Sequence, residues 1–91
     1  MTAAVTDSPA EHRFELKAGD DVAVARYRLA PGVITFTHTE VPTALSGQDI
    51  GSGLARGALE QVRAHGPRVV PKCPFIAAFI AKNAEFSDLV A

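Results

Sequence analysis

A glycine-containing segment in the middle of the chain has the composition of an anion-binding loop. It reads Gln48-Asp49-Ile50-Gly51-Ser52-Gly53 and precedes an amphipathic stretch. Glycines let backbone N–H groups approach a ligand closely, and the first turn of a helix carries unpaired N–H donors at the positive end of the helix dipole. The segment lacks the Lys-Ser/Thr pair of a P-loop and the three-glycine spacing of a dinucleotide-binding fingerprint. We expect either an anion site at a helix N-terminus or a tight helix start without a ligand.

The single cysteine, Cys73, is a second candidate for chemistry. Pro74 suits the first turn of a helix, so the thiol is expected at a helix N-terminus, where the dipole and free amides favour the thiolate. A thiolate is a nucleophile and can form a covalent intermediate with a substrate. The alternative is a buried cysteine that packs as a small hydrophobic side chain.

His38 and Glu40 form a third candidate group. The two-residue period of a strand predicts that Ile34, Phe36, His38 and Glu40 share one face. A histidine beside a carboxylate can transfer a proton in catalysis, whereas the alternative is a structural histidine bonded to its neighbour. The three histidines and one cysteine show no metal-ligand spacing, so no metal site is expected.

The elements that must position these residues follow from periodicity and turn signals. Strands are expected at residues 12–16, 22–29, 33–41 and 68–73, and helices are expected from residue 48 to His65 and from Pro74 onward. The order β-β-β-α-β-α places three strands in an antiparallel meander. The first helix then forms a right-handed crossover, which leaves its flanking strands parallel. The fold class is therefore α/β, with a sheet backed by helices.

Length and charge limit the number of domains and the kinds of partner that the chain can have. The 91 residues suffice for one domain, with a flexible tail expected at residues 1–11 and a single domain at residues 12–91. With 9 basic and 10 acidic residues, the chain lacks the basic surface that nucleic-acid binding needs. No membrane span or secretory signal is evident, so we expect a cytoplasmic protein. Because so short a domain has a small core, we expect a monomer or a weak homodimer.

Three blocks of sequence resemble a known family. Gln48-x-x-Gly51-x-Gly53 resembles motif A of the GNAT superfamily of N-acetyltransferases. His38-Thr39-Glu40-Val41 and Pro71-Lys72-Cys73-Pro74-Phe75 resemble the small GNAT-like proteins of the YjdJ and NATD1 type, and the likeness covers roughly residues 13–90. The resemblance implies a truncated GNAT fold, in which an antiparallel meander precedes a β-α-β-α unit and coenzyme A lies at two splayed strands.

The same resemblance implies a set of site residues. Acetyl-CoA is the implied co-substrate, with its pyrophosphate on the amides of the glycine segment and its pantetheine near Val41. The implied cofactor-binding residues are Val41, Gln48, Asp49, Ile50, Gly51, Ser52, Gly53 and Leu54. Arg56 and Lys82 are candidates for the 3′-phosphate. Phe79 occupies the place of the tyrosine that usually serves as the acid.

The implied activity is transfer of an acetyl group to an amine of a small molecule or a protein lysine. The amine attacks directly, with Glu40 and His38 as the base, or the acetyl group passes through Cys73. Two alternatives remain open. One is a non-catalytic coenzyme A or acyl-CoA-binding module, and the other is a protein-interaction domain that uses its sheet edge.

Overall fold

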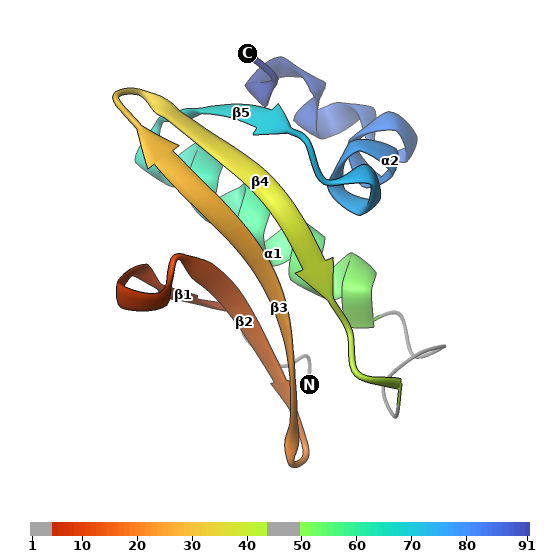
Figure 1. Cartoon of the computed structure of the whole chain (residues 1–91). Helices are drawn as coiled ribbons and strands as arrows, with labels where there is room; N and C mark the ends of the chain where they lie inside the picture. The colour runs from red at the N-terminus through yellow and green to blue at the C-terminus, as the bar shows by residue number, and fades with distance from the viewer. Residues whose placement is uncertain (1–4, 44–49) are drawn as a thin grey trace.

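A computed structural model describes residues 5–43 and 50–91 of the chain. A five-stranded sheet lies against helices on one side (Figure 1). In chain order the elements are β1 (Val5–Ser8), a 3-10 turn η1 (Pro9–Glu11), β2 (Arg13–Ala18), β3 (Asp21–Ala30), β4 (Val33–Glu40), α1 (Ile50–His65), β5 (Arg68–Pro71), α2 (Pro74–Lys82) and a 3-10 segment η3 (Ala84–Leu89). None of the described helices has the length and apolar character needed to cross a membrane.

The sheet has the expected α/β topology. The strand order is β1-β2-β3-β4-β5, in which neighbours from β1 to β4 are antiparallel and β4 pairs with β5 in parallel. Gly32 in the β3–β4 turn has φ 72° and Gly66 after α1 has φ 99°, values that favour glycine over residues with a Cβ. These two glycines lie where β4 begins and where α1 ends.

The N-terminal segment differs from the expected tail, because Val5–Ser8 form an edge strand paired with β2. The hydroxyl of Tyr27 donates to an Asp7 carboxylate oxygen at 2.6 Å. At Gly57 of α1 a Cβ atom would overlap Val5, so the glycine lets α1 lie directly on β1. The expectation of a tail through Glu11 is therefore wrong from Val5 onward. Edge pairing and one close helix contact order a segment that has no apolar periodicity of its own.

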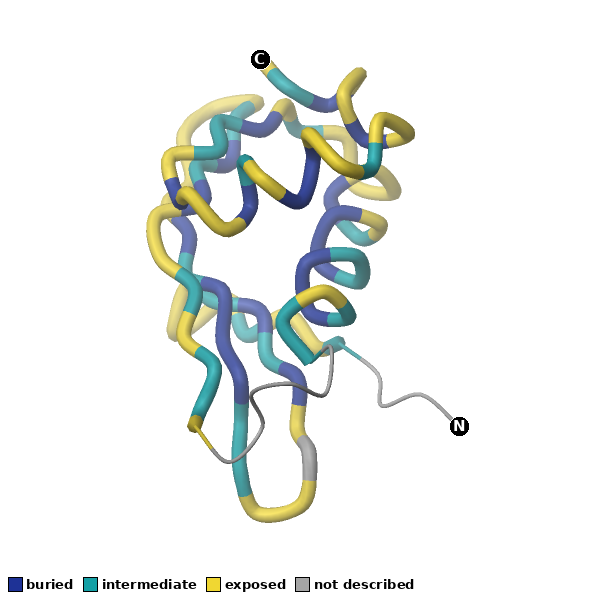
Figure 2. The backbone as a smooth tube through the Cα atoms, turned by 90° about the vertical axis from the view of Figure 1, so that its right-hand side faces the viewer, coloured by how far each residue is buried: buried dark blue, intermediate teal, exposed yellow. Residues whose placement is uncertain are grey.

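The core lies between the inner face of the sheet and the two helices. The amphipathic stretch expected after the glycine segment forms α1, which buries Leu54, Ala55, Ala58, Leu59 and Val62. Figure 2 shows α1 buried along the side that faces the sheet and exposed on the other side. On α2, Ile76, Phe79 and Ile80 join the same cluster, whereas Phe75 is 40% exposed. The core therefore binds both helices to one face of the sheet.

Candidate functional site

Strands β4 and β5 pair over only part of their length. Their parallel register ends at Phe36↔Pro71, while β4 continues to Glu40 and the chain after Pro71 turns into α2. The last link is the Cys73 N–H, which donates to the Phe36 carbonyl oxygen at 2.9 Å. Beyond it, residues 37–40 diverge from the start of α2 (Figure 1). This divergence is the splay that the truncated GNAT fold implies.

A β-bulge in β4 turns the side chains at the opening. Arg26 pairs with His38 and Tyr27 pairs with Phe36, which leaves Thr37 as an extra residue. Residues directly opposite each other in a sheet point to the same face. Because Arg26 is opposite His38, and Ala25, fully buried, is opposite Thr39, His38 points outward while Thr39 points to the core.

The expectation that Ile34, Phe36, His38 and Glu40 share a face is therefore wrong after Phe36. One inserted residue reverses the two-residue alternation, so every later side chain of the strand changes face. His38 and Glu40 lie on the outer face of the sheet, away from the helices.

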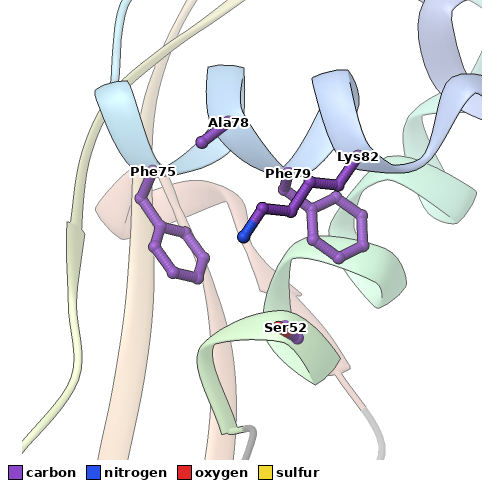
Figure 3. A pocket seen from close by; sticks show the side chains of 5 residues that line it. All are labelled: Ser52, Phe75, Ala78, Phe79 and Lys82. Carbon is purple, nitrogen blue, oxygen red and sulfur yellow. The ribbon is translucent and has the colours of Figure 1, made fainter.

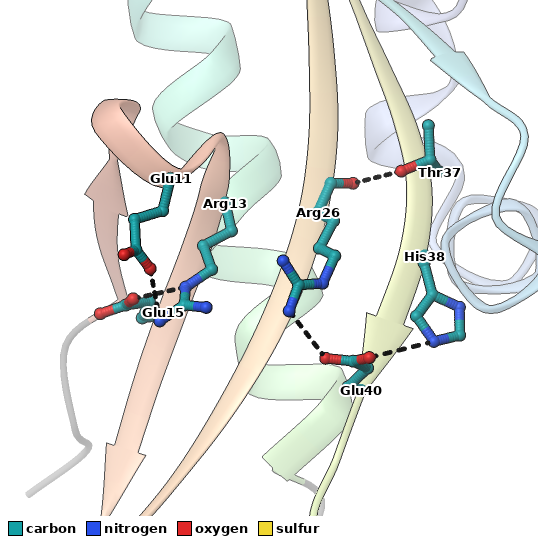
Figure 4. Close-up of polar contacts among 7 residues, drawn as sticks. All are labelled: Glu11, Arg13, Glu15, Arg26, Thr37, His38 and Glu40. Atoms are coloured by element: carbon teal, nitrogen blue, oxygen red, sulfur yellow. Dashed lines mark hydrogen bonds and ion pairs between the residues drawn. The ribbon is translucent and has the colours of Figure 1, made fainter.

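His38 and Glu40 nevertheless lie together, as expected. The Glu40 carboxylate is 3.5 Å from His38 Nε2 and 3.3 Å from an Arg26 guanidinium nitrogen (Figure 4). The His38 side chain is 62% exposed and that of Glu40 is 49% exposed. Arg26 was not expected in this group, because only the bulge register places it opposite His38. The arrangement is an accessible carboxylate held between an imidazole and a guanidinium, which can accept a proton from an approaching amine.

Cys73 lies where the opening begins. Its side chain is 2% exposed, and its Sγ is 3.2 Å from the Thr39 hydroxyl oxygen of β4. Its backbone is extended at φ −69° and ψ 122°, and it caps the N-terminus of α2. The position before a helix N-terminus agrees with the expectation from Pro74. The burial agrees with the alternative of a packed small side chain.

The first turn of α1 contacts α2 through a close approach at Gly51. A Cβ atom at Gly51 would lie 2.7 Å from Phe75 Cζ, so Gly51 makes room for that ring. At Gly53 the nearest atom to a Cβ is 3.7 Å away, an ordinary contact. Phe75 was not among the predicted site residues, since nothing in a local sequence pattern links two residues on different helices. Gln48 and Asp49 lie outside the described residues.

The other expected cofactor-binding residues differ in how far they are buried. Leu54 is fully buried, so only its backbone is available to a ligand. Ile50 and Val41 are partly buried and pack against the core, and Val41 follows the last residue of β4. Ser52 is exposed. The structure thus brings Val41 and the first turn of α1 to the same end of the sheet as the opening (Figure 1).

A small cavity lies between α1 and α2, close to this first turn. Its volume is about 190 Å³, and it is lined by Ser52, Phe75, Ala78, Phe79 and Lys82 (Figure 3). Phe79, which stands where the resemblance implies a tyrosine acting as the general acid, is 8% exposed and forms part of the cavity wall. Lys82, which the resemblance made a candidate for a phosphate contact, has its side chain at this cavity.

Arg56, the other candidate for a phosphate, has protein partners instead. It forms an ion pair with Glu85 at 3.0 Å, donates to Asn83 at 3.1 Å and lies over the Phe79 and Phe86 rings. Arg63 of the same helix pairs with Asp88 at 2.9 Å. These contacts fasten η3 to α1, which is a structural role that the sequence pattern did not indicate.

Comparisons with known proteins agree with this arrangement. The sequence profile described as "GCN5-related N-acetyl-transferase" matches residues 13–89. A solution structure of a GCN5-like protein from Staphylococcus aureus superimposes with a TM-score of 0.74 at 22% identity, covering 99% of this chain and 89% of the other. No curated protein matches significantly. Among the described residues, no group of three or more His, Cys, Asp or Glu side chains is placed to hold a metal ion.

Proposed function

Because the chain belongs to the GCN5-related N-acetyltransferase family, we propose that it binds acetyl-CoA and transfers the acetyl group to a primary amine. The observation that carries the proposal is the divergence of β4 from β5 after Phe36, beside the first turn of α1. The paired sequence blocks around His38 and Cys73 favour the small YjdJ-type or NATD1-type branch of the family.

The shape of the opening supports binding of an extended cofactor. Past Phe36 the register with β5 has ended, so the β5-facing edge of β4 is available to the amide groups of pantetheine near Val41. The amides of residues 50–54 are at the start of a 16-residue helix, where N–H donors and the helix dipole favour a pyrophosphate. Gln48 and Asp49 precede this turn and belong to the same proposed site.

The bulge supports an approach of the amine from the outer face. The first turn of α1 lies on the inner side of the sheet, whereas His38 and Glu40 lie on the outer side of the same opening. A thioester in the opening is therefore accessible to a nucleophile that enters past Glu40. Glu40, with His38, takes the proton of the amine as its nitrogen attacks the thioester carbonyl carbon. The carbon–sulfur bond then breaks, and the departing coenzyme A thiolate takes up a proton.

Cys73 supports a second route, in which its sulfur accepts the acetyl group before the amine does. Its thiol lies at the closed end of the opening, beside the Thr39 hydroxyl. Direct attack is the route we favour, because Cys73 is 2% exposed whereas the Glu40 side chain is 49% exposed. A module that binds coenzyme A without turnover is the remaining alternative.

Intact-mass spectrometry after incubation with acetyl-CoA separates these routes. With amines present, the wild type and Cys73→Ala are both expected to acetylate the acceptor. The wild-type protein is not expected to carry an acetyl group on Cys73. Acetylated Cys73 in the wild type, together with loss of transfer in Cys73→Ala, would establish the covalent route. Coenzyme A binding without acetylation of any amine would support the non-catalytic module.

A further inference from the structure

Another cavity lies between the sheet and the last turn of α1. Its volume is about 250 Å³, and its walls include four buried side chains, Phe14, Tyr27, Ile34 and Val62. Leu29 also lines it and is 61% exposed, so the cavity opens to solvent. An apolar cavity of about 150 Å³ is enough to bind benzene. This cavity therefore has room for a single ring with a short chain.

Three polar side chains also line the cavity, and each offers an acceptor to a ligand. The Asp7 carboxylate accepts from the Tyr27 hydroxyl at 2.6 Å, and a carboxylate can accept several hydrogen bonds at once. The Gln61 amide nitrogen donates to the Val5 carbonyl oxygen at 2.6 Å, which leaves the amide oxygen as its acceptor. His65 Nδ1 donates to the Gln61 carbonyl oxygen at 2.7 Å, so Nε2 is an acceptor in the neutral ring. A ligand that carries hydrogen-bond donors matches this set.

The charges around the cavity favour a cation over an anion. Among residues 5–43 and 50–91, Asp7 is the one carboxylate that lines it. The last turn of α1 adds the negative end of a helix dipole. Two nearby arginines are engaged elsewhere, because Arg63 pairs with Asp88 and Arg68 donates to the Val90 carbonyl oxygen. An ammonium group would meet acceptors here, whereas a ligand carboxylate would meet Asp7.

We propose that this cavity is a separate ligand site, which binds a small apolar organic cation such as a primary ammonium attached to one ring. The apolar walls hold the ring, and Asp7, Gln61 and His65 accept from the ammonium. The 16 residues of α1 make a helix about 24 Å long, and the proposed acetyl-CoA site lies at its first turn. An amine in the cavity is therefore too far from the thioester to be acetylated, so it is an effector rather than an acceptor.

Three probes with the same apolar part test the inference in the absence of coenzyme A. They are 2-phenylethylamine, 2-phenylethanol and 3-phenylpropanoate, which carry an ammonium, a hydroxyl and a carboxylate on one phenylethyl group. In ¹H–¹⁵N titrations at pH 8 and low ionic strength, the amine should bind about fivefold more tightly than the alcohol, the size of a solvent-exposed charge pair. The carboxylate should bind more weakly than the alcohol. The shifted amides should be those of residues 27–29 and 61–66.

Substitutions at the cavity separate the charge from the apolar contact. Asp7→Asn keeps an oxygen for the Tyr27 hydroxyl but removes the charge, so it should reduce the ratio of amine to alcohol affinity to about one. Asp20→Asn, in the β2–β3 turn and exposed, is the matched control and should keep the wild-type ratio. Leu29→Ala should weaken the amine and the alcohol alike, by about threefold, because apolar contact is lost. Far-UV circular dichroism confirms that each variant is folded.

Three outcomes would overturn the inference. Equal binding of amine and alcohol by the wild type would show that the cavity does not select a cation. Failure of all three probes to bind would show that the cavity is not a ligand site. Amine-induced shifts confined to residues 37–41 would place the amine in the opening of the sheet, as an acetyl acceptor. The first two outcomes leave the proposed function untouched and the third supports it, so the two proposals fail independently.

Discussion

Residues 33–36 of β4 lie between β3 and β5 and bury Ile34 and Phe36, whereas residues 37–40 have left the register with β5 and present His38 and Glu40 to solvent. The bulge at Thr37 separates the two halves of the strand. In the first half both neighbours and the core restrain each residue. In the second half one edge is open and the outward side chains are polar. One strand can thus serve the core and the proposed chemistry, because a single inserted residue divides it.

The largest expected effect is a loss of acetyl transfer when residues 37–40, the outward half of β4, are changed. Glu40→Gln keeps the shape of the side chain but removes the base, so acetyl transfer should fall by about 100-fold or more. The measurement is kcat/KM for acetyl transfer to a responsive amine. Glu15→Gln is the matched control, because Glu15 is also a carboxylate that pairs with an arginine on this sheet. Unchanged transfer in Glu40→Gln would remove Glu40 from the mechanism.

Substitutions in residues 33–36, the paired half of β4, should instead lower the stability of the protein. Phe36 is fully buried, so Phe36→Ala is expected to lower the free energy of unfolding by about 3–5 kcal/mol. Thr37→Ala, one residue later at the exposed bulge, should change it by less than about 0.5 kcal/mol. Urea unfolding followed by circular dichroism measures both. Similar losses in the two variants would show that the bulge is as important to the core as the paired half.

A double substitution distinguishes the two interpretations of the glycine segment. Gly51→Ala alone should push the Phe75 ring aside, because the new Cβ would lie 2.7 Å from Cζ. In a Phe75→Ala background this clash is absent. If backbone amides at this turn bind the pyrophosphate closely, Gly51→Ala should still weaken coenzyme A binding, by about tenfold for a lost charge-assisted contact. An unchanged affinity by calorimetry in that background would mean that Gly51 serves only to fit Phe75.

The smallest expected effect at neutral pH concerns Tyr27, the cross-strand partner of Phe36. Burial, and then the hydrogen bond to the Asp7 carboxylate, raise the pKa of Tyr27 well above its ordinary value of 10. A raised pKa in the folded state means that the neutral phenol contributes stability below about pH 10, which is lost as the pH rises further. Tyr27 is the single tyrosine of the chain, so ultraviolet absorbance follows its ionisation directly.

The wild type should therefore lose stability more steeply than Tyr27→Phe above pH 10, as measured by urea midpoints. Tyrosinate absorbance should appear only as the protein unfolds. A folded protein with an ordinary tyrosine titration near pH 10 would show that the phenol in the paired region is open to solvent.

Much of the fold follows from local sequence signals. Periodicity and turn signals predicted α1 and its neighbouring strands, because both act over a few residues. The structure has the corresponding buried stripe from Leu54 to Val62 and the turns at Gly32 and Gly66. Strand β1 was missed, since Val5–Ser8 has no apolar alternation and depends on pairing with β2. Contacts between segments that are far apart in the sequence produce little signal in the local sequence pattern.

The sequence predicted that two residues of the candidate site lie together, but it did not predict which face of the sheet they occupy. His38 and Glu40 were expected to act together, and they lie 3.5 Å apart. The bulge that turns them outward was not predictable, because threonines at positions 35, 37 and 39 fit either face of a strand. Phe75 and Arg26 entered the site only through tertiary contacts with Gly51 and His38.

Amide chemical shifts on titration with coenzyme A test the central claim most directly. If the cofactor lies in the opening of the sheet, the largest shifts in a ¹H–¹⁵N correlation spectrum should fall on residues 37–41 and 50–54. The amides of residues 33–36, in the same strand, should move much less, because both of their edges are already paired. Shifts confined to β1 and β2, or no shifts at saturating coenzyme A, would contradict the proposed site.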